Sequence, residues 1–244
     1  MGHAVTELIN SSSDFRIVAG VDVNASAVAA ACKFPVYQTV KDFPDKADVI
    51  IDFSHHSALA ELLEYATASS TPIVVCTTGH TEDERQMMKD ASASVPVFFS
   101  RNMSIGINLL IELCKQASKT LGLGFDIEII EKHHNQKLDA PSGTALMLAE
   151  SLAEEREETN FVYDRHERMQ KRSQAEIGIH AVRGGTIVGE HEVIFAGNNE
   201  ILTLSHSATS REIFATGALR AACFVVGKAP QMYDMSDVIK QIKL

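Results

Sequence analysis

The sequence has no tryptophan, and only 6% of its 244 residues are aromatic. It also lacks any apolar run near the ~18–20 residues that a membrane-spanning helix needs, and no signal peptide opens the chain. Basic residues are scarce, because 22 Lys and Arg stand against 32 Asp and Glu, a formal charge of −10. Nucleic-acid grooves and anionic membrane surfaces require basic footprints. We therefore expect no nucleic-acid partner and no membrane association.

Paired cysteines and metal-binding motifs are missing too. The four cysteines lie far apart in apolar surroundings and form no Cys-x-x-Cys pair: Cys32, Cys76, Cys114 and Cys223. This usage is typical of buried free thiols in a reducing compartment, so we expect a cytoplasmic protein. No His-Glu-x-x-His motif occurs, and His166, His180, His191 and His206 are scattered over separate segments. We expect no metal site.

A glycine-rich phosphate loop is the most informative absence. Nucleotide-binding sheets normally start with a strand and a G-x-G-x-x-G turn, whereas this chain runs from Met1-Gly2 directly into a helical pattern. Either residues upstream of Met1 are missing from this chain, or the first layer of the sheet is built in another way.

The first half of the sequence alternates short apolar runs with helical patterns. The runs read as buried parallel strands: Ile17–Asp22, Asp48–Phe53, Pro72–Cys76 and Pro96–Phe99. The helical patterns cover Ala25–Cys32, His56–Ser69 and Glu82–Ala93. This alternation predicts an α/β fold, a Rossmann-like parallel sheet with helices on both faces. Ligands of such sheets bind beyond the carboxyl ends of the strands.

The second half has a different pattern. A long helix (105–121), a strand (126–133) and a helix (141–158) precede a charged surface loop over residues 154–172. Strand-like runs at 176–183, 186–195 and 200–206 follow, separated by glycine-containing turns, and predict an antiparallel meander. We expect a second, α+β domain with a mixed or antiparallel sheet over residues 105–211, with residues 1–104 and 212–244 forming the dinucleotide-binding domain.

The densest group of chemically capable residues lies between Glu131 and Ala145. Pro141 suits a first helical turn, and Ser142, Gly143 and Thr144 would then offer free N–H groups and two hydroxyls at a helix start, a cradle for an anion. Lys137 can add a positive charge. The adjacent His133 and His134 face opposite sides of an extended chain, and either can deliver a proton near neutral pH. The alternative is an ordinary capped helix after a solvated loop.

Other candidates lie where the strands of the first half end. Asp22 ends its strand at the place where an acid accepts hydrogen bonds from a ribose hydroxyl, or merely caps the strand. No arginine follows Asp22 directly, which favours NADH over NADPH. The loops Thr77-Thr78-Gly79 and Asn102-Met103-Ser104 are at the correct edge for a cofactor, although ordinary turns have the same composition.

These residues resemble the dihydrodipicolinate reductase family, also named 4-hydroxy-tetrahydrodipicolinate reductase, over nearly the whole chain. The hallmark is the segment from Glu128 to Ala145, and further matches are Asp52-Phe53-Ser54, Thr77-Thr78-Gly79, Asn102-Met103-Ser104 and Val188-Gly189-Glu190-His191. The family's first glycine turn survives only as Met1-Gly2, which favours a chain truncated at its N-terminus and a short form that binds dinucleotide weakly. Cys76 stands where the family has a glycine.

The resemblance implies reduction of a cyclic dicarboxylic imine by NADH or NADPH in lysine and diaminopimelate synthesis. It implies His133 as the proton donor, Lys137 and His134 as substrate-holding residues, and Ser142, Gly143 and Thr144 as a carboxylate site. The cofactor would contact these residues: Met1, Gly2, Asp22, Phe53, Thr77, Thr78, Gly79, Asn102 and Met103. A homotetramer built through residues 176–206 is also implied. The alternatives are another two-domain oxidoreductase of amino or keto acids, or a catalytically impaired nucleotide-binding module.

Overall fold

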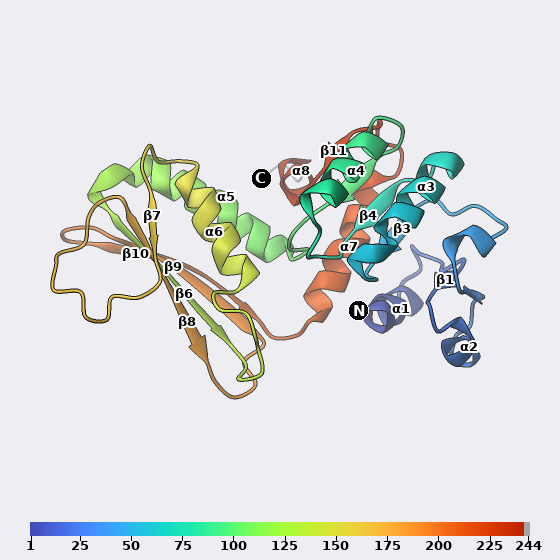
Figure 1. Cartoon of the computed structure of the whole chain (residues 1–244), viewed down its shortest axis with the longest axis horizontal. Helices are drawn as coiled ribbons and strands as arrows, with labels where there is room; N and C mark the ends of the chain where they lie inside the picture. Colours follow the sequence, from blue (N-terminus) through green and yellow to red (C-terminus); the bar gives the residue numbers. More distant parts are fainter. Residues whose placement is uncertain (242–244) are drawn as a thin grey trace. The chain divides into compact units, whose positions relative to one another are not determined.

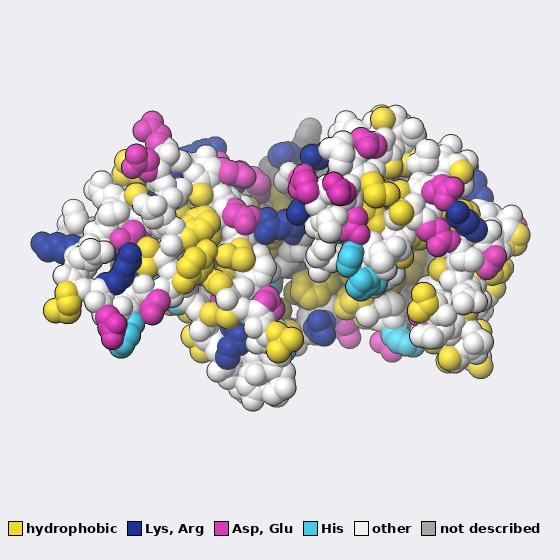
Figure 2. Space-filling model, in the orientation of Figure 1, with side chains coloured by type: hydrophobic (Ala, Val, Ile, Leu, Met, Phe, Trp, Pro, Cys, Tyr) yellow, Lys and Arg dark blue, Asp and Glu magenta, His cyan; other side chains and the backbone are white. Residues whose placement is uncertain are grey.

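The computed structural model describes residues 1–241 and divides the chain into two compact units (Figure 1). One unit comprises residues 1–103 and the segment from residue 212 onward, and the other comprises residues 104–211. Acidic and basic side chains are interspersed over the visible face of each unit (Figure 2). Within residues 1–241, every helix is too short or too polar to cross a membrane.

The first unit contains a four-stranded parallel sheet in the order β11-β5-β4-β3. Its strands are β3 (Ile50–Asp52), β4 (Ile73–Val75), β5 (Val97–Phe99) and β11 (Met232–Tyr233). Its helices are α1 (Gly2–Asn10), α2 (Ala25–Val28), α3 (Leu59–Ser69), α4 (Glu82–Ser92), α7 (Glu212–Val225) and α8 (Met235–Gln241). The predicted α/β class with a parallel sheet is confirmed.

Hydrophobic periodicity explains how these helices cover the sheet. In α3 the buried residues recur at helical spacing, Leu59, Leu62, Leu63 and Ala66, and they pack on Ile73 and Val75 of β4. The α7 helix contacts β3, β4 and β5 through small side chains such as Ala218, Ala221 and Ala222. Small residues allow this helix to approach the sheet closely.

The strand predicted at 17–22 is shorter than expected and does not belong to the four-stranded sheet. Only Gly20–Val21 forms β1, which pairs with β2 (Val36–Tyr37) in a separate two-stranded parallel sheet. Among the described residues, no strand joins this pair to β3. Periodicity identified the strand but carries no information about which neighbour it pairs with.

The second unit is a five-stranded mixed sheet with two helices packed on one face (Figure 1). The strands are β6 (Asp126–His133), β7 (Asn160–Val162), β8 (Glu176–Arg183), β9 (Gly189–Ala196) and β10 (Ile201–Ala208). The helices are α5 (Ile105–Leu121) and α6 (Gly143–Ala153). Alternate residues of β6 and β9, among them Ile127, Ile129, Val193 and Phe195, form the core beneath the helices.

The predicted antiparallel meander is wrong in one pairing. The order is β10-β9-β6-β8-β7, so β6 lies between β8 and β9, parallel to the former and antiparallel to the latter. Only β9 and β10 form a hairpin of neighbouring strands. The five residues 184–188 between β8 and β9 are long enough to pass over one strand, whereas a tight hairpin needs about two.

Two further expectations require correction. The helix predicted over 141–158 spans only Gly143–Ala153. The Ser142 side chain caps its start, which leaves Pro141 outside the helix, and the helix also ends earlier than predicted. The charged segment 154–172 contains β7, a three-residue edge strand. The sequence pattern does not predict it, because polar residues surround it on both sides. The cysteines are free, but only Cys76 and Cys114 are buried, whereas Cys223 is exposed and Cys32 is intermediate.

Candidate active site

A buried carboxylate organises the densest group of predicted site residues. Glu131 lies on the core-facing side of β6, in alternation with Ile127 and Ile129, and is fully buried. Its carboxylate accepts two bonds from the Arg183 guanidinium, at 2.6 and 2.8 Å, and one from the backbone N–H of Ser142 at 3.0 Å. Burial alone raises the pKa of Glu131, but these bonds and that of His133 outweigh it and leave the pKa below its ordinary value.

His133 is tied to this carboxylate. Its Nδ1 lies 2.6 Å from Glu131 Oε2, and its side chain is 11% exposed. The other ring nitrogen, Nε2, faces the backbone of Gly189 on β9, where an added methyl group would lie 3.0 Å away. Glu131 therefore fixes the ring through Nδ1. The other nitrogen, Nε2, lies beside Gly189, which has no side chain.

Ser142 connects the start of α6 to the same group. Its Oγ accepts a bond from the N–H of Ala145, which caps the helix, and lies 3.0 Å from Nε2 of His191. His191 is buried, and its ring stands edge-on to that of His133, with centroids 5.2 Å apart. Burial, followed by the proximity of His133, lowers the pKa of His191 to about 4, so His191 is uncharged at neutral pH.

The loop residues 134–139 are less tightly held. His134 is partly exposed, and the Lys137 ammonium pairs with the Asp139 carboxylate at 2.8 Å. Burial raises the pKa of Asp139, but Lys137 and backbone N–H groups, including that of Gly143, lower it by more. Asp139 thus binds Lys137 and one backbone N–H group, both of which were predicted to bind an anion. Gly143 and Thr144 form the first turn of α6.

In the first unit, a second buried carboxylate joins the ends of two strands. Asp52, at the end of β3, accepts bonds from the backbone N–H and hydroxyl of Ser54 and from the Thr77 hydroxyl, the last at 3.0 Å. The ends of β3 and β4 are therefore joined through Asp52 and Thr77 at the carboxyl edge of the sheet. Thr78 and Gly79 follow in an exposed turn, where Gly79 has φ +84° and open space around it.

The start of α4 links the same two loops. Glu84 and Thr81 form a capping box, and Glu84 also binds His56 Nδ1 at 2.8 Å. Hydrogen bonds from His56 and Thr81 lower the pKa of Glu84 to about 2. This carboxylate therefore stays charged at any ordinary pH and fixes the segment after β4 against the segment after β3.

The remaining predicted cofactor residues are dispersed in the first unit. Asp22 is exposed after β1 and accepts a bond from the N–H of Asn24, which supports the turn into α2. Met103 is buried, so only its backbone can face a ligand, while Asn102 is partly exposed. Met1 and Gly2 lie at the start of α1, whose first turn has no side-chain cap.

Sequence reasoning did not assign Glu131, Arg183 or His191 to the site. A usable signal existed for Glu131, because a charged residue in phase with the buried Ile127 and Ile129 must have compensating partners. The partner that balances its charge, Arg183, comes from β8, so it could be named only once the strand order was known. Among residues 1–241, no group of three or more His, Cys, Asp and Glu side chains is placed to hold a metal ion.

Two family models match this chain. The model for the N-terminus of dihydrodipicolinate reductase matches residues 1–103, and the model for its C-terminus matches residues 106–239. The chain belongs to the dihydrodipicolinate reductase family. The resemblance inferred from the segment between Glu128 and Ala145 is thereby confirmed.

Relatives in this family are similar over nearly their whole length. The 4-hydroxy-tetrahydrodipicolinate reductase of Caldanaerobacter subterraneus subsp. tengcongensis is 51% identical, over 99% of this chain and 94% of the relative. That of Clostridium tetani is 46% identical, over 96% of this chain and 91% of the relative.

Solved structures show the same fold. A dipicolinate-bound dihydrodipicolinate reductase from Paenisporosarcina sp. TG-14 has a TM-score of 0.78 and 23% identity, and the match covers 96% of this chain and 92% of that one. The diaminopimelate dehydrogenase of C. glutamicum is more distant, with a TM-score of 0.57 and 15% identity over 99% of this chain and 96% of that one.

Proposed function

We propose that this chain reduces 4-hydroxy-tetrahydrodipicolinate with a reduced nicotinamide cofactor, a step of lysine and diaminopimelate synthesis. Membership of the family and relatives that bear this name support the proposal. The observation that carries it is the buried group of Glu131, His133 and Ser142 beside the first turn of α6. Such a group combines a proton carrier with a site for a carboxylate.

In this proposal the second unit binds the substrate. One carboxylate binds at the first turn of α6, where Gly143 and Thr144 present N–H groups at the positive end of the helix dipole, next to the Ser142 cap. Lys137 supplies a full positive charge, and His134 contacts the ring from the loop. The dipicolinate in the solved family structure is a dicarboxylate of the same kind, which supports this substrate class.

We assign the proton transfer to His133 rather than His134. The imidazolium of His133 gives the proton on Nε2 to the ring carbon next to the one that receives hydride, and the ring becomes neutral. His133 is suited to this because Glu131 fixes its other nitrogen at 2.6 Å, whereas His134 lies in the partly exposed loop. Proton transfer by a positioned histidine is typical of reactions near neutral pH.

The first unit is proposed to bind the cofactor, which supplies the hydride when it is bound. The residues present fit such a group, because the Asp52–Thr77 bond brings two loops together at the carboxyl edge of the sheet and Gly79 leaves open space there. Phe53, Thr77, Thr78, Gly79, Asn102 and Met103 would contact it. Met1 and Gly2 would offer the uncapped first turn of α1 to a phosphate.

We favour NADH over NADPH. Asp22 is exposed and negatively charged at the end of β1, and the sequence from Val21 to Val28 contains no Lys or Arg. A carboxylate suits a ribose hydroxyl and repels a phosphate on the same oxygen. We also propose a cytoplasmic location, which the free cysteines support, and a homotetramer, for which the face of the sheet opposite α5 and α6 is the proposed interface.

Steady-state kinetics test the proposed function. The purified chain should oxidise NADH when 4-hydroxy-tetrahydrodipicolinate is added, with a lower kcat/KM for NADPH. Pyruvate and 2-oxoglutarate in the presence of ammonium serve as controls for a general keto acid oxidoreductase. Turnover with these compounds alone would assign the chain to that other class. Binding of NADH without turnover of any of them would indicate a nucleotide-binding module.

A further inference from the structure

We infer that Glu131 is a positioning residue for proton transfer, which orients His133 and ties it to the carboxylate site at Ser142. This inference rests on the proposed function and concerns a residue that contacts neither substrate nor cofactor. Glu131 accepts four bonds from three different elements: Arg183 of β8, His133 of its own strand and the N–H of Ser142 at the start of α6. A single carboxylate therefore fixes the proton donor relative to the anion cradle.

The two oxygens of this carboxylate bind different partners. Oε2 lies 2.6 Å from His133 Nδ1, and Oε1 accepts from the Ser142 N–H at 3.0 Å. Since a carboxylate can only accept, the proton on Nδ1 is fixed in place and Nε2 is the nitrogen that gains and loses the transferred proton. After the transfer, the neutral ring keeps its bond to Glu131 and does not need to turn.

Charge balance makes this arrangement possible. Arg183 compensates the buried carboxylate through two bonds, so that the Glu131–Arg183 pair is neutral and the imidazolium of His133 adds one positive charge near the site of a dianionic substrate. Charged and titratable groups from every neighbouring element face this region: Glu131 of β6, Arg183 of β8, His191 of β9, His206 of β10, and Lys137 and Asp139 of the loop.

Glu131→Gln is the variant that tests the inference. The amide oxygen of Gln can still accept from Arg183 or Ser142, but its amide nitrogen donates, so His133 would have to accept at Nδ1 and carry its proton on Nε2 in the neutral form. We expect kcat to fall by about 100-fold or more, with KM changed by less than about threefold. The basic limb of the pH–kcat profile, along which the donor loses its proton, should move to lower pH, because removal of the neighbouring carboxylate charge disfavours the imidazolium form of His133.

Glu128→Gln is the matched control. Glu128 lies on the same strand, but it faces the other side of the sheet and binds Arg165, Arg172 and His180. This variant should keep kcat and the pH profile of the unaltered protein. Glu131→Asp retains the charge but has a side chain that is shorter by one methylene group. It should keep the pH profile while losing part of kcat. Thermal denaturation of each variant shows whether it is folded.

A second readout does not depend on turnover. Titration calorimetry with dipicolinate, in two buffers of different ionisation enthalpy, gives the number of protons taken up on binding. The unaltered protein near pH 7.5 should take up a fraction of a proton, and Glu131→Gln should take up less. A folded Glu131→Gln variant with an unchanged pH profile and unchanged proton uptake would overturn the inference. Absence of reductase activity in the unaltered protein with the expected proton uptake would instead refute only the proposed function.

Discussion

His191 is a buried histidine that is uncharged at neutral pH, and this has a consequence for stability. Its pKa of about 4 in the folded protein lies below the ordinary value of 6.5, so the unfolded chain binds a proton at higher pH than the folded chain does. The stability contributed by neutral His191 is therefore complete above pH 6.5 and is lost as the pH falls to about 4. The full loss is about 3 kcal/mol.

The variant His191→Gln should not show this loss. At pH 7 it is expected to be less stable than the unaltered protein, because it loses packing against His133. By pH 4 the difference between the two should shrink by about 2–3 kcal/mol. Urea unfolding of both proteins at several pH values measures the difference. A gap that is constant between pH 7 and pH 4 would contradict the assignment of His191 as a buried neutral group.

Asp139 occupies two groups that the proposed function assigns to the substrate. Its carboxylate holds Lys137 at 2.8 Å and faces the N–H of Gly143, two groups assigned to a substrate carboxylate. Asp139→Asn should therefore tighten dipicolinate binding, by about two- to fivefold at low ionic strength, with a smaller effect in high salt. Calorimetric titration measures the change, with Asp164→Asn as a surface control. Weaker binding would show that Asp139 instead holds Lys137 in its working position.

Individual residues could be predicted from sequence where a local pattern fixes their chemistry. His133 and Ser142 were placed in the candidate site because a strand end, a polar loop and a helix start follow one another within 15 residues. Arg183 and His191 could not, because each reaches the site from a strand that is distant in sequence. Their contribution depends on the order of strands, which no local pattern encodes.

At the scale of elements, the start of β9 determines how much room His133 has. Gly189 lies beside its Nε2, and a methyl group there would be 3.0 Å from that nitrogen, while Glu131 holds the opposite side of the ring at 2.6 Å. The ring cannot move away without breaking this bond. Gly189→Ala should therefore lower kcat by about tenfold or more, since small displacements of a catalytic group are costly.

Gly184→Ala is the matched control for this prediction. Gly184 lies in the connection between β8 and β9, and an added methyl group would meet nothing within 4 Å. This variant should keep the kcat of the unaltered protein. Equal activity of the two alanine variants, measured by NADH oxidation under saturating conditions, would show that the close approach of β9 to His133 is unimportant.

Elements with strong periodicity were predicted almost to the residue. The helix over 105–121 and the strand over 126–133 have the expected bounds, because the apolar positions of each recur at the spacing of its structure. Errors arose where capping or pairing decided the outcome. The Ser142 cap moved the start of the helix that follows it, and the position of β6 between β8 and β9 replaced the expected meander.

At the scale of the whole molecule, one face of the second unit's sheet carries apolar residues without covering helices. Ile130 and Ile194 point away from the core beneath α5 and α6, and Val182 on the same side is 46% exposed. If this face forms the proposed homotetramer, Ile194→Lys should shift the protein to smaller species. Light scattering after size-exclusion chromatography measures the mass, with Leu123→Lys as an exposed control. An unaltered tetramer in Ile194→Lys would exclude this interface.

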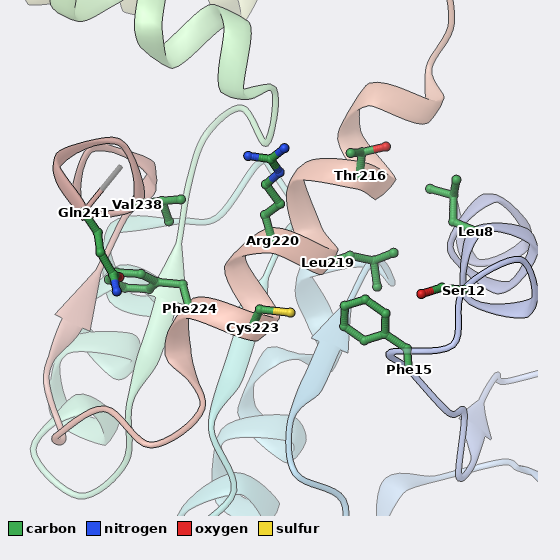
Figure 3. Close-up of a pocket in the computed structure, with 10 residues that line it drawn as sticks. All are labelled: Leu8, Ser12, Phe15, Thr216, Leu219, Arg220, Cys223, Phe224, Val238 and Gln241. Carbon is green, nitrogen blue, oxygen red and sulfur yellow. The ribbon is translucent and has the colours of Figure 1, made fainter. Parts of the chain in front are cut away.

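The first unit also contains a groove that the proposed function does not use. It has a volume of about 650 Å³ and lies along α7, where Phe15 faces Leu219 and Cys223 (Figure 3). None of the proposed cofactor residues lines it. Its lining is mostly apolar, whereas the proposed cofactor site lies at the strand ends near Asp52 and Thr77.

Substitution of His133 tests the central claim most directly. His133→Gln removes the proposed proton donor and retains a side chain of similar size that can bind Glu131. Stopped-flow and steady-state oxidation of NADH with 4-hydroxy-tetrahydrodipicolinate should show kcat reduced by at least about 100-fold, while NADH binding and thermal stability remain close to those of the unaltered protein. Retention of full kcat in the folded variant would contradict the account.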